Sequence, residues 1–109
     1  MSGYRQGRDV EYEVIHSLTE DGYDTIRAAS SKGLADVVAI KPGQVLLVNV
    51  KRTTPPGPAE RKALLRVASH LPGVAVPLVA LGRPSLQFRR LTGVEPWAWV
   101  PWFADEVAS

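Results

Sequence analysis

The first apolar pattern in the chain has the spacing of a helix. Val10, Val14 and Leu18 recur every four residues, so their side chains fall on one face. Gly22 follows at a place where helices commonly end. The pattern predicts a helix over residues 8–21.

Three short apolar runs follow, each with the length of a strand. Between the second and the third run, Pro42 and Gly43 suit the two central positions of a type II turn, which predicts an antiparallel hairpin. With this turn setting the register, Asp36 would face Asn49 across the hairpin. The strands expected from these runs are 25–29, 36–40 and 45–51.

The second half of the chain predicts one helix followed by two strands. Pro58 suits the first turn of a helix that would run to about Leu71, before Pro72 and Gly73. Pro77 lies within the next apolar run and lacks an N–H, which predicts an edge strand or a bulge there. The strands expected here are 74–81 and 86–91, whereas the Trp-rich tail, 92–109, is assigned to no element.

The order of these elements predicts an α/β fold with a central mixed five-stranded sheet flanked by helices. The strand, helix, strand unit over 45–81 would form a right-handed parallel crossover, while the preceding hairpin is antiparallel. A chain of 109 residues fits one modest core, so we expect a single domain over 1–109.

Composition limits the chemistry more than it defines it. The chain has no Cys and two His, which excludes thiol chemistry and makes a zinc site improbable, so any metal would be held by oxygen atoms. A net charge of +2 permits nucleic-acid binding without requiring it. No apolar run approaches a membrane span and no secretory signal is evident, so we expect a cytoplasmic protein.

Four polar residues are expected to meet at the open end of the hairpin. Asn49 and Lys51 share one face of their strand, and Asp36 would lie opposite them. Glu11 lies on the apolar side of the first helix, where a buried carboxylate needs a cation such as Lys51 or a metal. Carboxylate and carbonyl oxygens are preferred ligands of Mg²⁺, and a nearby Lys can orient a water that attacks a phosphodiester. The alternative is a purely structural salt-bridge network.

These residues also carry a family resemblance. Glu11, the stretch GYDTIRAASSKGLADVVAI, and VLLVNVK with Arg52 and Thr53 resemble the archaeal-type Holliday junction resolvases of the PD-(D/E)xK nuclease superfamily, including phage-borne relatives. The resemblance covers residues 5–53. It implies a restriction-endonuclease-like core, a homodimer, and metal-dependent hydrolysis of four-way DNA.

The resemblance also implies roles for individual residues. Glu11, Asp36, Asn49 and the Val50 carbonyl would hold Mg²⁺ or Mn²⁺. Lys51 would assist the attacking water. Ser31 matches a Ser near the scissile phosphate.

One position departs from the family pattern. The family has Glu where this chain has Asn49, so the site would carry one negative charge fewer. Weaker metal binding, a preference for Mn²⁺, and loss of cleavage all remain open. We therefore keep two alternatives to an active resolvase: a nuclease-like protein that binds DNA without cutting it, and a structural or partner-binding domain.

DNA binding would require cations that meet phosphates without reading sequence. The aromatic residues of the tail, Trp97, Trp99, Trp102 and Phe103, could cover a dimer seam or close the core of the monomer. The candidate phosphate contacts are Arg5, Arg8, Arg27, Lys32, Arg52, Arg61 and Lys62.

Overall fold

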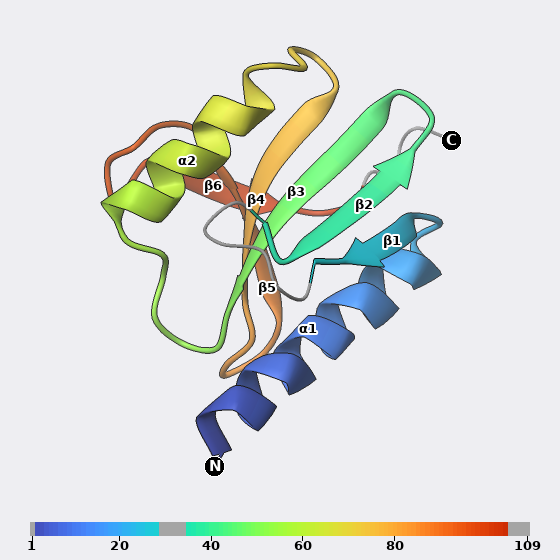
Figure 1. The fold of residues 1–109 in the computed structure, drawn as a ribbon, viewed down its shortest axis with the longest axis vertical. Coiled ribbons are helices and arrows are strands. Elements are labelled where there is room, and N and C mark those ends of the chain that lie inside the picture. Colours follow the sequence, from blue (N-terminus) through green and yellow to red (C-terminus); the bar gives the residue numbers. More distant parts are fainter. Residues whose placement is uncertain (1, 29–34, 105–109) are drawn as a thin grey trace.

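The computed structural model describes residues 2–28 and 35–104, which form a mixed sheet with two helices (Figure 1). The fold class is the α/β class expected from the sequence, but the sheet has six strands instead of five. No helix within the described residues is long and apolar enough to cross a membrane. The elements are α1 (Ser2–Glu20), β1 (Asp24–Arg27), β2 (Val37–Lys41), β3 (Gln44–Lys51), α2 (Pro58–Ala68), β4 (Ala75–Leu81), β5 (Gln87–Leu91) and β6 (Trp99–Trp102).

The strands lie side by side in the order in which they occur along the chain. Strands β3 and β4 are parallel and are joined through α2, whereas the other neighbouring pairs are antiparallel. Figure 1 shows α1 beside β1 and α2 beside β4. The expected hairpin and parallel crossover are therefore both present.

Side chains of β3 alternate between two apolar clusters. Leu46 and Val48 pack in the cluster that contains Val10, Val14 and Leu18 of α1. Leu47 packs against the second cluster, which contains Leu64 of α2. Because successive strand residues point to opposite faces, Asn49 and Lys51 share the α2 face with Leu47.

Both chain reversals that the sequence predicts before β3 are present, and each contains the expected glycine. Gly22 follows α1 with φ of 94°, and Gly43 lies between β2 and β3 with φ of 76°. A left-handed φ strains residues that carry a Cβ, so both positions favour glycine. Val37 pairs with Val48, which is the register that the Pro42 and Gly43 turn predicts.

The prediction for Pro77 was wrong. Strand β4 is central and fully buried, and Pro77 pairs in register with Leu47 of β3. The Val45 N–H donates to the Val74 carbonyl, so the even-numbered residues of β4 direct their backbone groups toward β3. Backbone direction alternates along a strand, so Pro77 and the other odd-numbered residues direct theirs away from β3. Strand β5 pairs with β4 from Leu78 onward, so no β5 residue is paired with Pro77. The missing N–H therefore costs no ladder hydrogen bond.

Helix α2 ends three residues before the expected end. After Ala68, the Ser69 hydroxyl donates to the Arg66 carbonyl at 2.6 Å, and the Leu71 carbonyl accepts from both Val74 and Ala75. These contacts complete a turn in place of a further helical turn. Leu71 therefore lies outside the helix, and its side chain is exposed.

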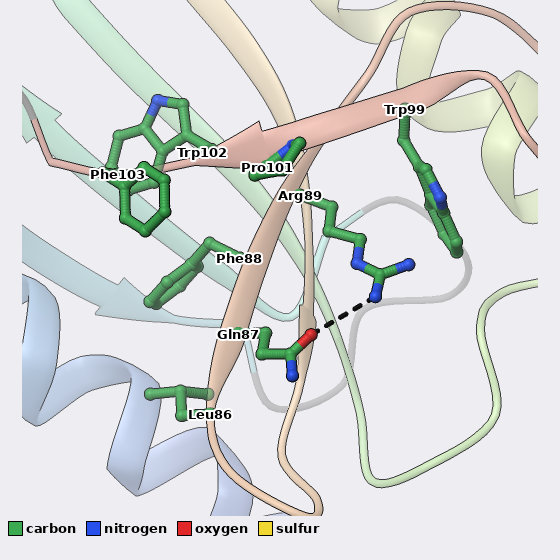
Figure 2. Close-up of a pocket in the computed structure, with 8 residues that line it drawn as sticks. All are labelled: Leu86, Gln87, Phe88, Arg89, Trp99, Pro101, Trp102 and Phe103. Carbon is green, nitrogen blue, oxygen red and sulfur yellow. Dashed lines mark hydrogen bonds between the residues drawn. The ribbon is translucent and has the colours of Figure 1, made fainter.

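The tail that the sequence left unassigned contributes β6. Trp99 packs against the α2 cluster, and Trp102 packs against the α1 cluster with its ring 5.6 Å from that of Phe88. Trp97 and Phe103 remain exposed. Figure 2 shows the surface hollow between β5 and β6, which Phe88, Trp102 and Phe103 help to line. The tail therefore closes the monomer's core with two aromatic residues and leaves two on the surface.

Candidate active site

Asp36 lies at the open end of the hairpin, one residue before β2. Its backbone N–H donates to the Val48 carbonyl at 2.8 Å, which continues the hairpin ladder. Its Oδ2 accepts the N–H of Val50 at 2.7 Å. These two bonds fix the carboxylate against the end of β3, as the register predicted.

The charge of Asp36 is unfavourable in its surroundings. Burial raises the pKa of this carboxyl above its usual range, and the nearby carboxylates of Glu11 and Glu60 add to the increase. The Val50 N–H and the Lys51 ammonium lower the pKa without cancelling the effect of burial. Asp36 therefore lies within electrostatic reach of three charged side chains from α1, β3 and α2.

Asn49 is buried with an unsatisfied oxygen. Its side chain shares the α2 face of β3 with Lys51, and the residue is 4% exposed. Its Oδ1 has no hydrogen-bond partner among the described residues. Burying a carbonyl oxygen without a donor costs about 1–3 kcal/mol, so native structures normally satisfy such atoms with protein, water or an ion. A cation at Asp36 would be a suitable partner.

Lys51 is held by a residue that the sequence analysis did not identify. Its Nζ lies 3.0 Å from Oε2 of Glu60, the third residue of α2. The second carboxylate oxygen, Oε1, accepts the N–H of Gly57 at 3.2 Å. A Glu at the third helical position is a recognised capping signal, so the sequence could have indicated the Gly57 contact. Nothing in its spacing indicates the contact with Lys51.

Glu11 has a cationic partner, as its position on α1 predicted, but the partner is Arg27. Nε of Arg27 lies 2.7 Å from Oε1 of Glu11, and both side chains are mostly buried. The guanidinium also lies over the ring of Tyr12, at 5.5 Å from the ring centre. Of the two partners suggested for Glu11, Lys51 or a metal, Lys51 is paired with Glu60 instead, and Arg27 pairs with Glu11.

Arg61 does not suit the role of a phosphate contact. It is 6% exposed, and its guanidinium donates to the carbonyls of Pro56 at 2.7 Å and Val94 at 2.8 Å. The side chain thus ties α2 to the loop before it and to the loop between β5 and β6. Its position three residues before Leu64 places it on the buried side of the helix, which the apolar pattern alone did not indicate.

The remaining candidates differ in what the structure describes. Lys62 is exposed and Arg52 is partly exposed. Arg5 and Arg8 belong to α1, but their side chains are outside the described set, and Ser31 and Lys32 lie outside the described residues altogether. Within residues 2–28 and 35–104, no three side chains of the Asp, Glu, His or Cys type form a group that could hold a metal by themselves.

This geometry agrees with the comparison to known families. The family described as archaeal Holliday junction resolvase (Hjc) matches residues 2–56, a segment that contains Glu11, Asp36, Asn49 and Lys51. The match places the chain in the class of Holliday junction resolvase nucleases. The chain belongs to the archaeal Holliday junction resolvase family, as the sequence resemblance indicated.

A solved structure supports the same fold. The chain is similar to Hjc, a Holliday junction resolvase from the archaeal hyperthermophile Archaeoglobus fulgidus, with a TM-score of 0.58 and 23% identity. The match covers 76% of this chain and 70% of that one. No curated protein matches the chain.

Proposed function

We propose that this protein is a metal-dependent, structure-selective endodeoxyribonuclease that hydrolyses phosphodiesters at four-way DNA junctions. The observation that carries this proposal is the arrangement of polar groups at the open end of the β2 and β3 hairpin. There, Asp36 is fixed against β3 beside the unsatisfied oxygen of Asn49, within electrostatic reach of Lys51. Family membership supplies the class of substrate.

The donor set at this end fits a hard divalent cation. Asp36 offers a carboxylate oxygen, Asn49 an amide oxygen with no other partner, and Val50 a backbone carbonyl, all of which are oxygen ligands of the kind that Mg²⁺ and Mn²⁺ accept. Glu11 adds a second carboxylate nearby. Bound there, the cation would supply Lewis acidity and lower the pKa of a bound water.

The residues of the chain would perform the remaining tasks. An ammonium has three N–H donors, so the bond to Glu60 does not exhaust Lys51, which can also orient a water or a phosphate oxygen. The Val50 N–H holds the Asp36 carboxylate in one orientation, which fixes the direction of its metal-binding oxygen. The Arg27 guanidinium holds Glu11 in the same way.

DNA binding and assembly form part of the proposal. Arg5, Arg8, Lys32, Arg52 and Lys62 would position the duplex arms through phosphates, with Ser31 near the scissile phosphate. Arg27 would contribute by orienting Glu11 and by adding positive charge. Two symmetric cuts require two active sites, so we propose a two-fold homodimer, which sedimentation of the purified protein would detect.

Cleavage of a labelled four-way junction tests this function. We expect paired symmetric cuts in Mg²⁺ or Mn²⁺, little cutting of a linear duplex of the same sequence, and loss of cutting with a chelator. Asp36→Ala should abolish the cuts, because it removes the carboxylate that defines the site.

The specific alternative arises from Asn49. If the amide leaves the metal site too weak, the protein would bind junctions tightly and cut them in neither metal. This result would contradict the cleavage proposal and favour a nuclease-like protein that binds four-way DNA without cutting it. Failure to bind junctions in preference to duplex would contradict both.

A further inference from the structure

We propose that Glu60 takes part in metal binding at this active site through a water on the cation, supplying from α2 the negative charge that Asn49 does not supply from β3. The inference rests on the proposed function, because it assumes a cation at Asp36. It adds a residue from the part of the chain beyond the segment that the family matches, 2–56.

The first argument is the position of Glu60. Its carboxylate is bonded to Lys51, which follows Asn49 by two residues on the same face of β3. The hairpin register places Asp36 opposite Asn49 on the same face of the sheet. Glu60 therefore lies in the same polar cluster as Asp36, Asn49 and Lys51, although α2 begins seven residues after β3 ends.

The second argument is the unsatisfied oxygen of Asn49. An acidic cluster alone does not define a metal site, but this one contains a buried amide oxygen that no described group satisfies. A cation that bonds to this oxygen needs balancing negative charge, because Asn49 is neutral. Glu11 and Glu60 are each paired with a cation, Arg27 at 2.7 Å and Lys51 at 3.0 Å. Glu60 comes from α2, on whose side of β3 the Asn49 side chain lies, whereas Glu11 comes from α1.

The third argument concerns how Glu60 would bind. The described residues contain no group of three acidic side chains close enough to coordinate one ion directly. Mg²⁺, however, commonly keeps several waters and is bound through one or two carboxylates. Glu60 would therefore bind a water on the cation, while Oε1 keeps its bond to Gly57.

A matched pair of substitutions tests this role without relying on cleavage. Glu60→Gln removes the charge and keeps one acceptor oxygen, which can still accept from the Gly57 N–H, so the helix start is preserved. Glu13→Gln is the control, because Glu13 is also a partly exposed carboxylate paired with a cation, Arg83 at 3.2 Å. Equal unfolding temperatures for the two variants would show that neither disrupts the fold.

The measurement is the affinity for Mn²⁺ in the absence of DNA. The electron paramagnetic resonance signal of free Mn²⁺ reports how much of the ion remains unbound. We expect Glu60→Gln to weaken binding by about 10-fold or more, in the range found for groups that hold metal ligands indirectly. We expect Glu13→Gln to leave binding unchanged. Asn49→Glu should restore most of the affinity in the Glu60→Gln background, because it returns the missing charge.

The outcomes separate this inference from the proposed function. Unchanged Mn²⁺ affinity in Glu60→Gln would overturn the role of Glu60, even if the protein cuts junctions. Weaker affinity that Asn49→Glu restores would support it, even if the protein binds junctions without cutting them. A wild-type protein that binds no Mn²⁺ would overturn both the inference and the metal-dependent function.

Discussion

The segment that matches the resolvase family, 2–56, differs in character from residues 57–104. The family segment contains polar groups that constrain one another, including the Arg27 pair with Glu11 and the Asp36 bond to Val50. The later part supplies α2 and an aromatic surface on β5 and β6, where a hollow of about 470 Å³ is bordered by the exposed Phe103 (Figure 2). The polar groups of the candidate site are therefore concentrated in the hairpin, but the partner of Lys51, Glu60, comes from α2.

The strongest test of this division is Lys51→Met. If Lys51 orients the attacking water, its loss should reduce the cleavage rate by about 10²–10⁴, the usual contribution of a positioned proton-handling group. Junction binding should change little, because the Lys51 ammonium is already paired with the Glu60 carboxylate. Rates and affinities should be measured on the same labelled junction.

Lys62→Met is the matched control for Lys51→Met, because it removes an exposed ammonium from α2. It should weaken junction binding and flatten its salt dependence without lowering the rate at saturating protein. An equal loss of rate in both variants would contradict a special role for Lys51.

The second test concerns the hydrogen bonds by which Arg61 connects α2 to two neighbouring loops. Arg61→Met should lower the free energy of unfolding by about 2–3 kcal/mol, because hydrogen bonds from a charged group to the Pro56 and Val94 carbonyls are lost. Urea unfolding measures this change, with Arg66→Met on the exposed side of α2 as the control. If both variants unfold alike, Arg61 does not tie the helix to its loops.

The smallest expected effect is a pH dependence of folding stability that arises from Asp36, in the family segment. Because the pKa of Asp36 is raised in the folded protein, the folded state holds this proton more tightly than the unfolded state does. The stability contributed by protonated Asp36 is therefore present below its unfolded pKa and is lost as the pH rises through the folded pKa. Asp36→Asn should remove this loss while its amide oxygen still accepts from Val50.

Thermal unfolding in the presence of a chelator would reveal this effect. Asp36→Asn should gain stability relative to wild type as the pH rises from about 3 to 7, a range that begins below the reference pKa of Asp. The exposed Asp24→Asn serves as the control. A gain that does not vary with pH, or a loss, would show that burial of the Asp36 charge is not costly.

Much of the family segment could be predicted from the sequence because its signals are local. Gly22, Pro42 and Gly43 fix the chain reversals, and the register that follows places Asp36 at the end of β3. Partner choice was not predictable in the same way. Glu11 needed a cation, but whether Arg27 or Lys51 would meet it depends on how α1 packs on the sheet.

The later part of the chain was harder to predict because long-range packing overrides its local signals. Pro77 suggests an edge strand, yet β4 lies between β3 and β5, and Pro77 is tolerated because β5 pairs with β4 only from Leu78 onward. Arg61 has the composition of a surface residue, yet two backbone carbonyls make its burial favourable. The contact of Glu60 with Lys51 depends on how α2 packs against the sheet, which no short motif encodes.

The position of the metal is the central claim, and an NMR titration with Mn²⁺ tests it most directly. The bound ion broadens signals of nearby nuclei, so at low Mn²⁺ we expect the Val50 backbone amide and the Asn49 side-chain amide to broaden first. Amide signals of β6 should persist, and Asp36→Ala should remove the selective broadening. Broadening centred elsewhere in the chain, or equal broadening of all signals, would contradict a metal site at the end of the β2 and β3 hairpin.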